Sequence, residues 1–180
     1  MRKGGITFIA AILAIASAGV AADPVEFGVG SFAFSRPAGW GWIVPASPMR
    51  KAQLSVPGSS GGDAGEVTFF HFGAGQGGGV QANVDRWFGQ FRNGSTRQNV
   101  ETIGTTRVTF VEAEGTFLSG MPGTSPTPRD GFAMRGAILE DAVGGDVFVK
   151  MTGPLVVVKA AEAEFRAMIS GAASRTASAR

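Results

Sequence analysis

The sequence of 180 residues predicts an α+β fold, in which a mainly antiparallel sheet of about six strands carries two helices. Three observations lead to this prediction. Several short segments alternate apolar and polar residues, as half-buried strands do. Two other segments repeat apolar residues at the spacing of an amphipathic helix. Finally, 44% of the residues are hydrophobic and 17% are charged, which is enough apolar material for the core of one domain.

The first 22 residues have the composition of a signal peptide. Two basic residues precede an apolar stretch at 6–18, and Val20 and Ala22 suit the −3 and −1 positions of a cleavage site before Asp23. An uncleaved anchor is the alternative, although the apolar stretch is shorter than the roughly 20 residues that span a bilayer. We therefore expect an exported protein, periplasmic or extracellular, with no membrane insertion after the signal is cleaved.

Six segments of the remaining chain have the pattern of strands. They lie at 32–35, 49–56, 66–72, 106–117, 132–141 and 146–152. The last two flank Gly144 and Gly145, which suit a hairpin corner because glycine tolerates positive φ. Adjacent strands joined by short turns run antiparallel, so we expect a mainly antiparallel sheet.

The two expected helices lie at 80–91 and 154–170. The first repeats apolar residues along one stripe, which consists of Val80, Val84, Trp87, Phe88 and Phe91. The second begins at Pro154, which suits a first helical position, and ends at Gly171. Its expected inner face consists of Val158, Ala161, Phe165, Met168 and Ile169. The alternative, in which Val156–Val158 extends the preceding strand, is opposed by Pro154.

We expect a single α+β domain at 23–170 and a flexible tail at 171–180. Packing both helices on one face of the sheet would bury both apolar stripes. The aromatic N-terminal region would then cover the other face. Loops are expected at 57–65 and 119–131, which are rich in glycine, serine or proline.

Composition excludes several classes of site. The chain has no cysteine, so it has no disulfide, thiolate metal site or cysteine nucleophile, and its single histidine rules out any site with two imidazoles. The expected signal peptide holds two basic residues and no acidic one, which leaves 14 basic and 14 acidic residues in the mature chain. This balance gives no support for a nucleic-acid partner. The acidic residues suit a solvated surface better than a metal site, and we expect neither metal nor cofactor.

Two short motifs resemble the PsbP-like fold superfamily. The stretch from Phe34 to Trp40 is similar to the F-x-x-P-x-G-W opening of that fold, and Lys150 to Pro154, with the helix that follows, is similar to its end. The resemblance covers about 32–170. The middle stretch, 73–91, is closer to a group of uncharacterised exported bacterial proteins. The resemblance implies an α/β sandwich and a binding or assembly role, and it carries over no functional residue.

The most distinctive segment is a glycine-rich loop between an expected strand and an expected helix. Its candidate ligand-binding residues are Gly75, Gln76, Gly77, Gly78 and Gly79. Backbone N–H groups at a helix N-terminus can hold a phosphate, a sulfate or a carboxylate. A dinucleotide is disfavoured because the neighbouring strands look antiparallel rather than parallel. The alternative is a turn whose glycines serve only to adopt positive φ.

Three other candidate contact residues are Trp40, Trp42 and His71. The two tryptophans form either an exposed aromatic pair or a cover for the sheet, whereas Trp87 lies on the helix stripe and is expected in the core. His71 ends a strand, and a buried or edge position fits it better than a catalytic base, since the chain has no G-x-S-x-G elbow.

These observations favour an exported, non-enzymatic binding or assembly module of the bacterial cell envelope, whose partner is another protein or an envelope component. The alternative is an anion-binding, ligand-binding or hydrolytic protein that uses the glycine loop at 73–79.

Overall fold

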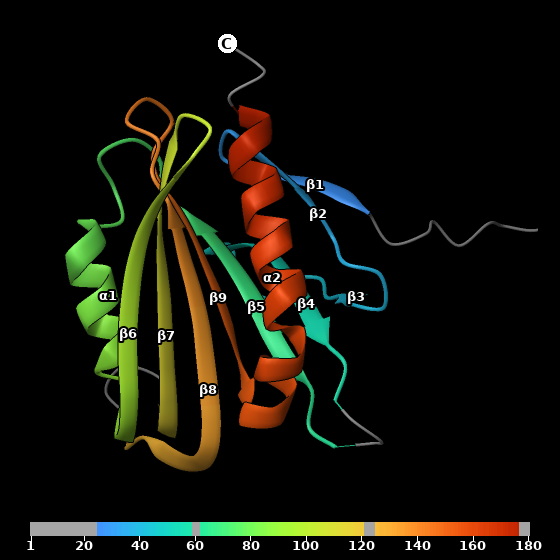
Figure 1. Cartoon of the computed structure of the whole chain (residues 1–180), viewed down its shortest axis with the longest axis vertical. Helices are drawn as coiled ribbons and strands as arrows, with labels where there is room; N and C mark the ends of the chain where they lie inside the picture. The colour runs from blue at the N-terminus through green and yellow to red at the C-terminus, as the bar shows by residue number, and fades with distance from the viewer. Residues whose placement is uncertain (1–24, 59–61, 121–124, 177–180) are drawn as a thin grey trace, which may run out of the picture.

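A computed structural model describes residues 25–58, 62–120 and 125–176 as an α+β fold (Figure 1). In chain order its elements are β1 (Glu26–Val29), β2 (Phe32–Ser35), β3 (Gly41–Trp42), β4 (Arg50–Val56), β5 (Gly65–His71), α1 (Val80–Phe88), β6 (Phe91–Ile103), β7 (Thr106–Ser119), β8 (Thr127–Leu139), β9 (Val147–Pro154) and α2 (Leu155–Thr176). The expected signal peptide and the last four residues of the expected tail lie outside the described residues.

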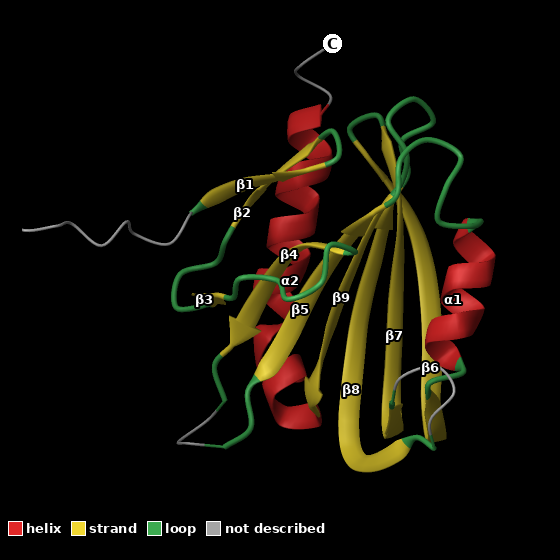
Figure 2. Ribbon diagram, turned by 180° about the vertical axis from the view of Figure 1, so that it is seen from behind, coloured by secondary structure: helices red, strands yellow, loops and turns green. Residues whose placement is uncertain are grey.

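Seven strands form the main sheet, in the order β3-β4-β5-β9-β8-β7-β6, and β1 pairs with β2 in a separate hairpin. Every neighbouring pair is antiparallel, as the sequence predicts. Strands β8 and β9 form the expected hairpin, in which Leu139 lies opposite Val147. Figure 2 shows the long strands β6, β7 and β8 beside the shorter β5 and β9.

The central strands bury apolar side chains on both faces of the sheet. In β9, Val147, Val149 and Met151 belong to one core cluster, whereas Phe148 belongs to a second. Because side chains alternate along a strand, the two clusters lie on opposite faces. We call them the α2 face and the α1 face, after the helix that covers each.

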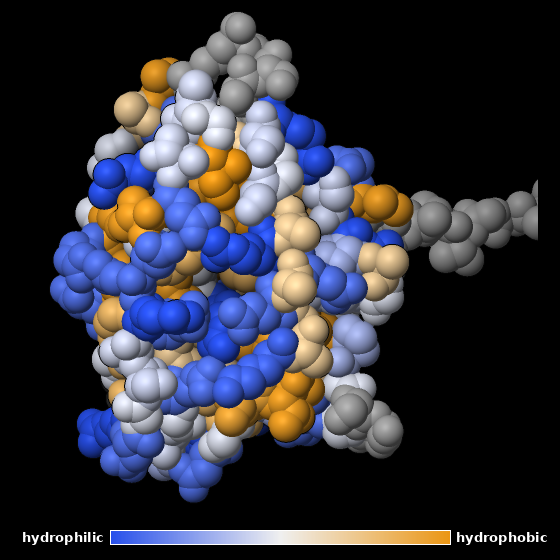
Figure 3. Space-filling model, viewed as in Figure 1, coloured by the Kyte–Doolittle hydropathy of each residue, from blue (hydrophilic) through white to orange (hydrophobic). Residues whose placement is uncertain are grey.

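The α2 face carries the larger core. Helix α2 buries its predicted inner face there, namely Val158, Ala161, Phe165, Met168 and Ile169. The β1–β2 hairpin joins the same cluster through Val29, Phe32 and Phe34. On the side of the molecule that carries α2, hydrophilic residues predominate and apolar residues lie in separate patches (Figure 3).

The prediction that both helices share one face is wrong. Helix α1 packs through Val84 and Trp87 against Val111, Met134 and Phe148, on the face opposite α2. The N-terminal hairpin is also on the α2 face and not opposite it. The physical reason is that strands with apolar residues at consecutive positions need cover on both sides.

Both helices end at residues other than the predicted ones. Helix α1 stops at Phe88, and Phe91 starts β6 instead of completing the stripe. Helix α2 runs through Gly171 to Thr176 because Ala172 and Ala173 are buried in the α2-face core. Their burial outweighs the roughly 1 kcal/mol that a glycine costs inside a helix. The expected tail is therefore helical as far as residue 176.

Helix α1 is too short to cover its face of the sheet. Its nine residues span about 14 Å, whereas the 13 residues of β6 or β8 extend for about 43 Å. Part of the α1 face over β4, β5 and β9 is consequently open. Within the described residues, no helix combines the length and the hydropathy needed to cross a bilayer.

Candidate functional site

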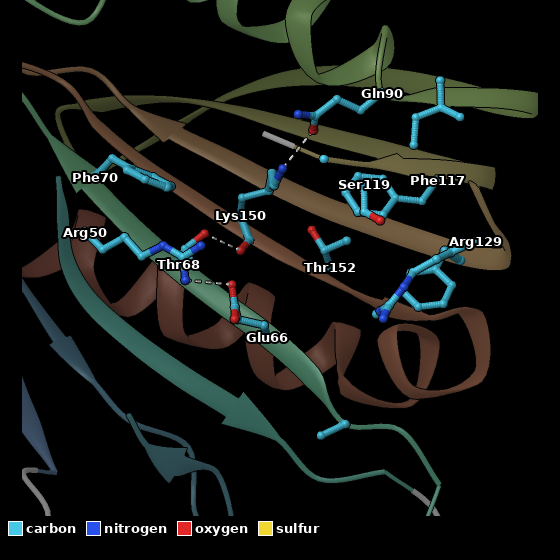
Figure 4. A pocket seen from close by; sticks show the side chains of 15 residues that line it. Arg50, Glu66, Thr68, Phe70, Gln90, Phe117, Ser119, Arg129, Lys150 and Thr152 are labelled. Carbon is cyan, nitrogen blue, oxygen red and sulfur yellow. Dashed lines mark hydrogen bonds and ion pairs between the residues drawn. The ribbon is translucent and has the colours of Figure 1, made fainter. Parts of the chain in front are cut away.

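The open part of the α1 face contains a cavity of about 420 Å³, which we call the polar pocket. Side chains of β4, β5, β7, β8 and β9 line it, together with Gln90 from the turn between α1 and β6. Its lining includes Arg50, Glu66, Thr68, Phe70, Gln90, Phe117, Ser119, Arg129, Phe132, Lys150 and Thr152. Figure 4 shows Lys150 near the middle, with Arg50 and Arg129 on opposite sides of it.

The side chain of Lys150 projects from the α1 face, because its neighbours in β9, Val149 and Met151, project into the core on the α2 face. It lies opposite Thr68 of β5 on one side and Gly136 of β8 on the other. Its ammonium group donates a hydrogen bond of 2.8 Å to the amide oxygen of Gln90 and lies 5.6 Å from the centre of the Phe117 ring. A polar amide and an aromatic face thus hold this cation in position.

The polar pocket carries more positive than negative charge. Arg50 is paired with Glu66 at 3.2 Å, and that carboxylate also accepts a hydrogen bond from Gln53. Arg129 lies over the Phe132 ring at 5.2 Å. Within the described part of the chain, neither Arg129 nor Lys150 forms a salt bridge with a carboxylate. Two cations therefore face the cavity without an anionic partner.

The burial of Lys150 among other cations lowers the pKa of its amine. The pKa of its amine falls from 10.5 to about 8, chiefly because of burial; Glu66 opposes this shift, and the guanidinium groups of Arg86 and Arg50 contribute to it. An anion bound beside Lys150 would reverse this shift, because an opposite charge favours the protonated form.

A buried hydroxyl group without a hydrogen-bond partner among the described residues lies beside Lys150. Thr152 follows on the same face of β9 and lines the polar pocket. Its hydroxyl oxygen is buried and, among the described residues, has no hydrogen-bond partner. Buried hydroxyl groups are normally hydrogen-bonded, since an unpaired one costs about 1–3 kcal/mol. A ligand oxygen in the pocket would supply the missing partner.

An apolar pocket of about 390 Å³ adjoins the polar pocket. Its apolar lining comprises Met49, Phe70, Phe72, Trp87 and Phe148, and its polar lining includes Asn83, Arg86, Gln90 and Lys150. Phe72 lies between Phe70 and Phe148, with ring centres 6.4 and 6.0 Å away. Met49 and Phe72 remain 60% and 37% exposed, so this aromatic wall faces solvent.

Gly136 gives the Trp87 indole its place against the sheet. A Cβ atom at this position would lie 2.6 Å from Cζ3 of Trp87, which is closer than van der Waals contact allows. The glycine lets α1 approach β8 and seats Trp87 in the core, as predicted. The indole in turn forms part of the apolar pocket.

The glycine loop connects β5 to α1, as the sequence predicts. Gly75, Gly77 and Gly78 adopt positive φ, and Gly79 is the N-cap of α1. The buried Asn83 amide donates hydrogen bonds to the carbonyls of Gly77 and Gly79, at 2.9 and 3.0 Å. These features fit a strand-to-helix turn. Gly77 alone of the five candidate residues borders the apolar pocket, and anion binding by this loop stays a prediction.

The structure separates the remaining candidates from the two pockets. Trp40 is buried in the α2-face core, where its indole donates a 2.9 Å hydrogen bond to Glu164, so it offers no surface to a partner. Trp42 is half-buried against Phe27. Trp40 therefore belongs to the core under α2 and Trp42 to the edge strand β3, so neither covers a face of the sheet opposite the helices. His71 lies at the end of β5, where Nε2 donates to the Gly144 carbonyl at 2.9 Å.

Acidic side chains are held by protein partners. Glu112 pairs with Arg97, Glu140 pairs with Arg107, and Glu114 pairs with the buried Arg135. In residues 25–58, 62–120 and 125–176, no three histidine or acidic side chains gather as ligands of a metal ion would.

The sequence prediction missed the residues that line the polar pocket. The alternation of DVFVKMT places Phe148, Lys150 and Thr152 on one face of a strand, and EVTFFHF does the same for Thr68 and Phe70. This signal was present in the sequence. The pattern identifies a pocket only once the strand order is known, because that order places β5 beside β9 with their α1 face open.

The sequence matches no protein-family model and no curated protein. Among solved structures, the chain is similar to the cyanobacterial PsbP protein of Synechocystis sp. PCC 6803, with a TM-score of 0.53 and 9% identity over 87% of this chain and 95% of that chain. A protein of unknown function from Pseudomonas aeruginosa gives a TM-score of 0.48 at 12% identity, covering 81% of this chain and 92% of that one. The chain has a PsbP-like fold.

Proposed function

We propose that this chain is an exported, non-enzymatic binding or assembly module of the bacterial cell envelope, and that the polar pocket holds an anionic group of its partner. One observation carries the second part of the proposal. Lys150 and Arg129 face a cavity of about 420 Å³ without a carboxylate partner among the described residues. Unpaired cations in a partly buried site favour an anionic ligand.

Export and the absence of catalysis have separate support. Residues 1–22 have the charge and hydropathy pattern of a signal peptide. His71 is engaged with a backbone carbonyl away from the pocket, and Glu66, the acidic residue of the pocket, is paired with Arg50. Among its described residues, the pocket therefore offers cationic groups that attract an anion, while its carboxylate, Glu66, is engaged by Arg50.

Titration of the protein with inorganic phosphate and with acetate tests the pocket, using NMR spectra of the backbone amides. We expect shifts in β9 near Lys150 and Thr152, and we expect Arg129→Met to weaken them about tenfold. Arg97→Met is the matched control, since Arg97 is 72% exposed and lies on the edge strand β6. Shifts that avoid the pocket, or that survive Arg129→Met unchanged, would contradict the proposal.

Export has its own test. Protein recovered from outside the bacterial cytoplasm should begin at Asp23 when its N-terminus is sequenced. A chain that stays in the cytoplasm with residues 1–22 attached would contradict the proposal of export, but it would not bear on anion binding by the polar pocket.

A further inference from the structure

The polar pocket and the apolar pocket adjoin on the α1 face, and we call the two together the groove. Phe70, Gln90 and Lys150 line both cavities and so form their common boundary. Lys150 lies at the junction, where its ammonium group is held by Gln90. A ligand bound at this amine can extend into either pocket.

The two ends of the groove differ in chemistry. At one end are Arg129 and the unpartnered Thr152 hydroxyl. At the other end are Met49, Phe72 and Phe148, of which the first two are exposed to solvent. Burying these apolar side chains under a ligand removes their surface from water and so favours binding.

We infer that the groove binds a small amphipathic anion, whose acidic head lies between Lys150 and Arg129 and whose hydrocarbon or aromatic tail lies against Phe72 and Phe148. This inference rests on the proposed function, in which the polar pocket is an anion site, and adds the class of ligand. The two cavities, each of about 400 Å³, have the size of small-molecule sites.

The charge pattern favours an anion over a cation or a neutral ligand. Among the described residues, Arg50, Arg86, Arg129 and Lys150 line the groove, against the single carboxylate of Glu66, which is already paired. Ligand oxygens would accept hydrogen bonds from the ammonium group and the Thr152 hydroxyl, which are the groups left incompletely satisfied in the free protein.

Five probes separate head from tail in calorimetric titrations, with the charged long-chain ones kept below their micelle concentrations. Decanoate carries both features, acetate lacks the tail, decanol lacks the charge, and decyltrimethylammonium reverses the charge. Decyl phosphate shows which acidic head is preferred. We expect decanoate or decyl phosphate to bind at least about tenfold more tightly than acetate and decanol, and we expect no binding of the cation.

Paired variants locate the ligand. Lys150→Met should weaken decanoate binding about tenfold, while Lys159→Met, on the opposite face, should leave it within about twofold. Phe72→Ala should weaken decanoate about fivefold and leave acetate unchanged, because acetate has no tail. Val143→Ala is its control, since Val143 is 79% exposed and lies outside the groove.

The outcomes distinguish this inference from the proposed function. Acetate or phosphate binding at Lys150, with decanoate no tighter, would overturn the amphipathic ligand and leave the anion site standing. Failure of every anion to bind would overturn both. Decanoate that binds Lys150→Met as well as the parent would also overturn the inference.

Discussion

Replacing Lys150 by methionine should make the folded protein more stable at neutral pH, although it weakens anion binding. The pKa of Lys150 is lowered from 10.5 to about 8, chiefly by burial. Each pH unit of such a shift corresponds to about 1.4 kcal/mol, so the charged amine costs the fold about 3 kcal/mol at pH 7. Loss of its hydrogen bond to Gln90 offsets about 1 kcal/mol of the gain. We expect a net stabilisation of about 2 kcal/mol.

The pH dependence gives this prediction a sign that can be checked. Below pH 8 the amine is protonated in both the folded and the unfolded chain, so the full cost is present. Between pH 8 and 10.5 the unfolded chain binds more protons than the folded chain. The free energy of unfolding of the parent protein therefore rises with pH in this window, and the advantage of Lys150→Met disappears above it.

Urea unfolding, followed by tryptophan fluorescence at several pH values from 7 to 11, measures the effect. The background is low because the chain contains no tyrosine and no cysteine that would titrate in this window. Lys159→Met is the control, since that lysine is 54% exposed and pairs with Glu114. A Lys150→Met variant that is less stable than the parent at pH 7, or a parent with no rise between pH 8 and 10.5, would refute the reasoning.

Three further substitutions test the groove and its supports by urea unfolding. Thr152→Val should raise the free energy of unfolding by about 1 kcal/mol, because it removes a buried hydroxyl without a described partner; a loss of stability would reveal a partner. Gly136→Ala should cost about 1–3 kcal/mol and shift the NMR signal of the Trp87 indole, because its Cβ would lie 2.6 Å from Cζ3; an unshifted signal would place the indole elsewhere. Trp40→Phe should cost about 1–3 kcal/mol through its lost bond to Glu164 and its smaller volume, with anion affinity unchanged; weaker anion binding would tie Trp40 to the site.

Local pattern was sufficient to predict most elements of the fold. The stripe of α2 and the alternation in β2, β5, β7 and β9 depend on neighbours in sequence, and the structure confirms them. Strand β6 was missed because its side chains are mostly exposed on both faces, which leaves no apolar period to detect. Pairing with β7, and not its own composition, makes it a strand.

The candidate site could be predicted less well than the fold. The glycine loop was conspicuous because its residues are adjacent in sequence, whereas the polar pocket combines β4, β5, β7, β8 and β9. The α1 face of β9 is partly open because α1 is short and packs on that side of the sheet. Lys150 is an ordinary residue in the sequence, and its unusual state arises only from packing.

A crystal structure of the protein with 10-bromodecanoate tests the central claim most directly. Anomalous scattering from bromine locates the end of the tail, and the electron density locates the acidic head. We predict bromine in the apolar pocket near Phe72 and a carboxylate within hydrogen-bond distance of Lys150 Nζ. Bromine on the α2 face, or a carboxylate that lies away from Lys150, would contradict the account.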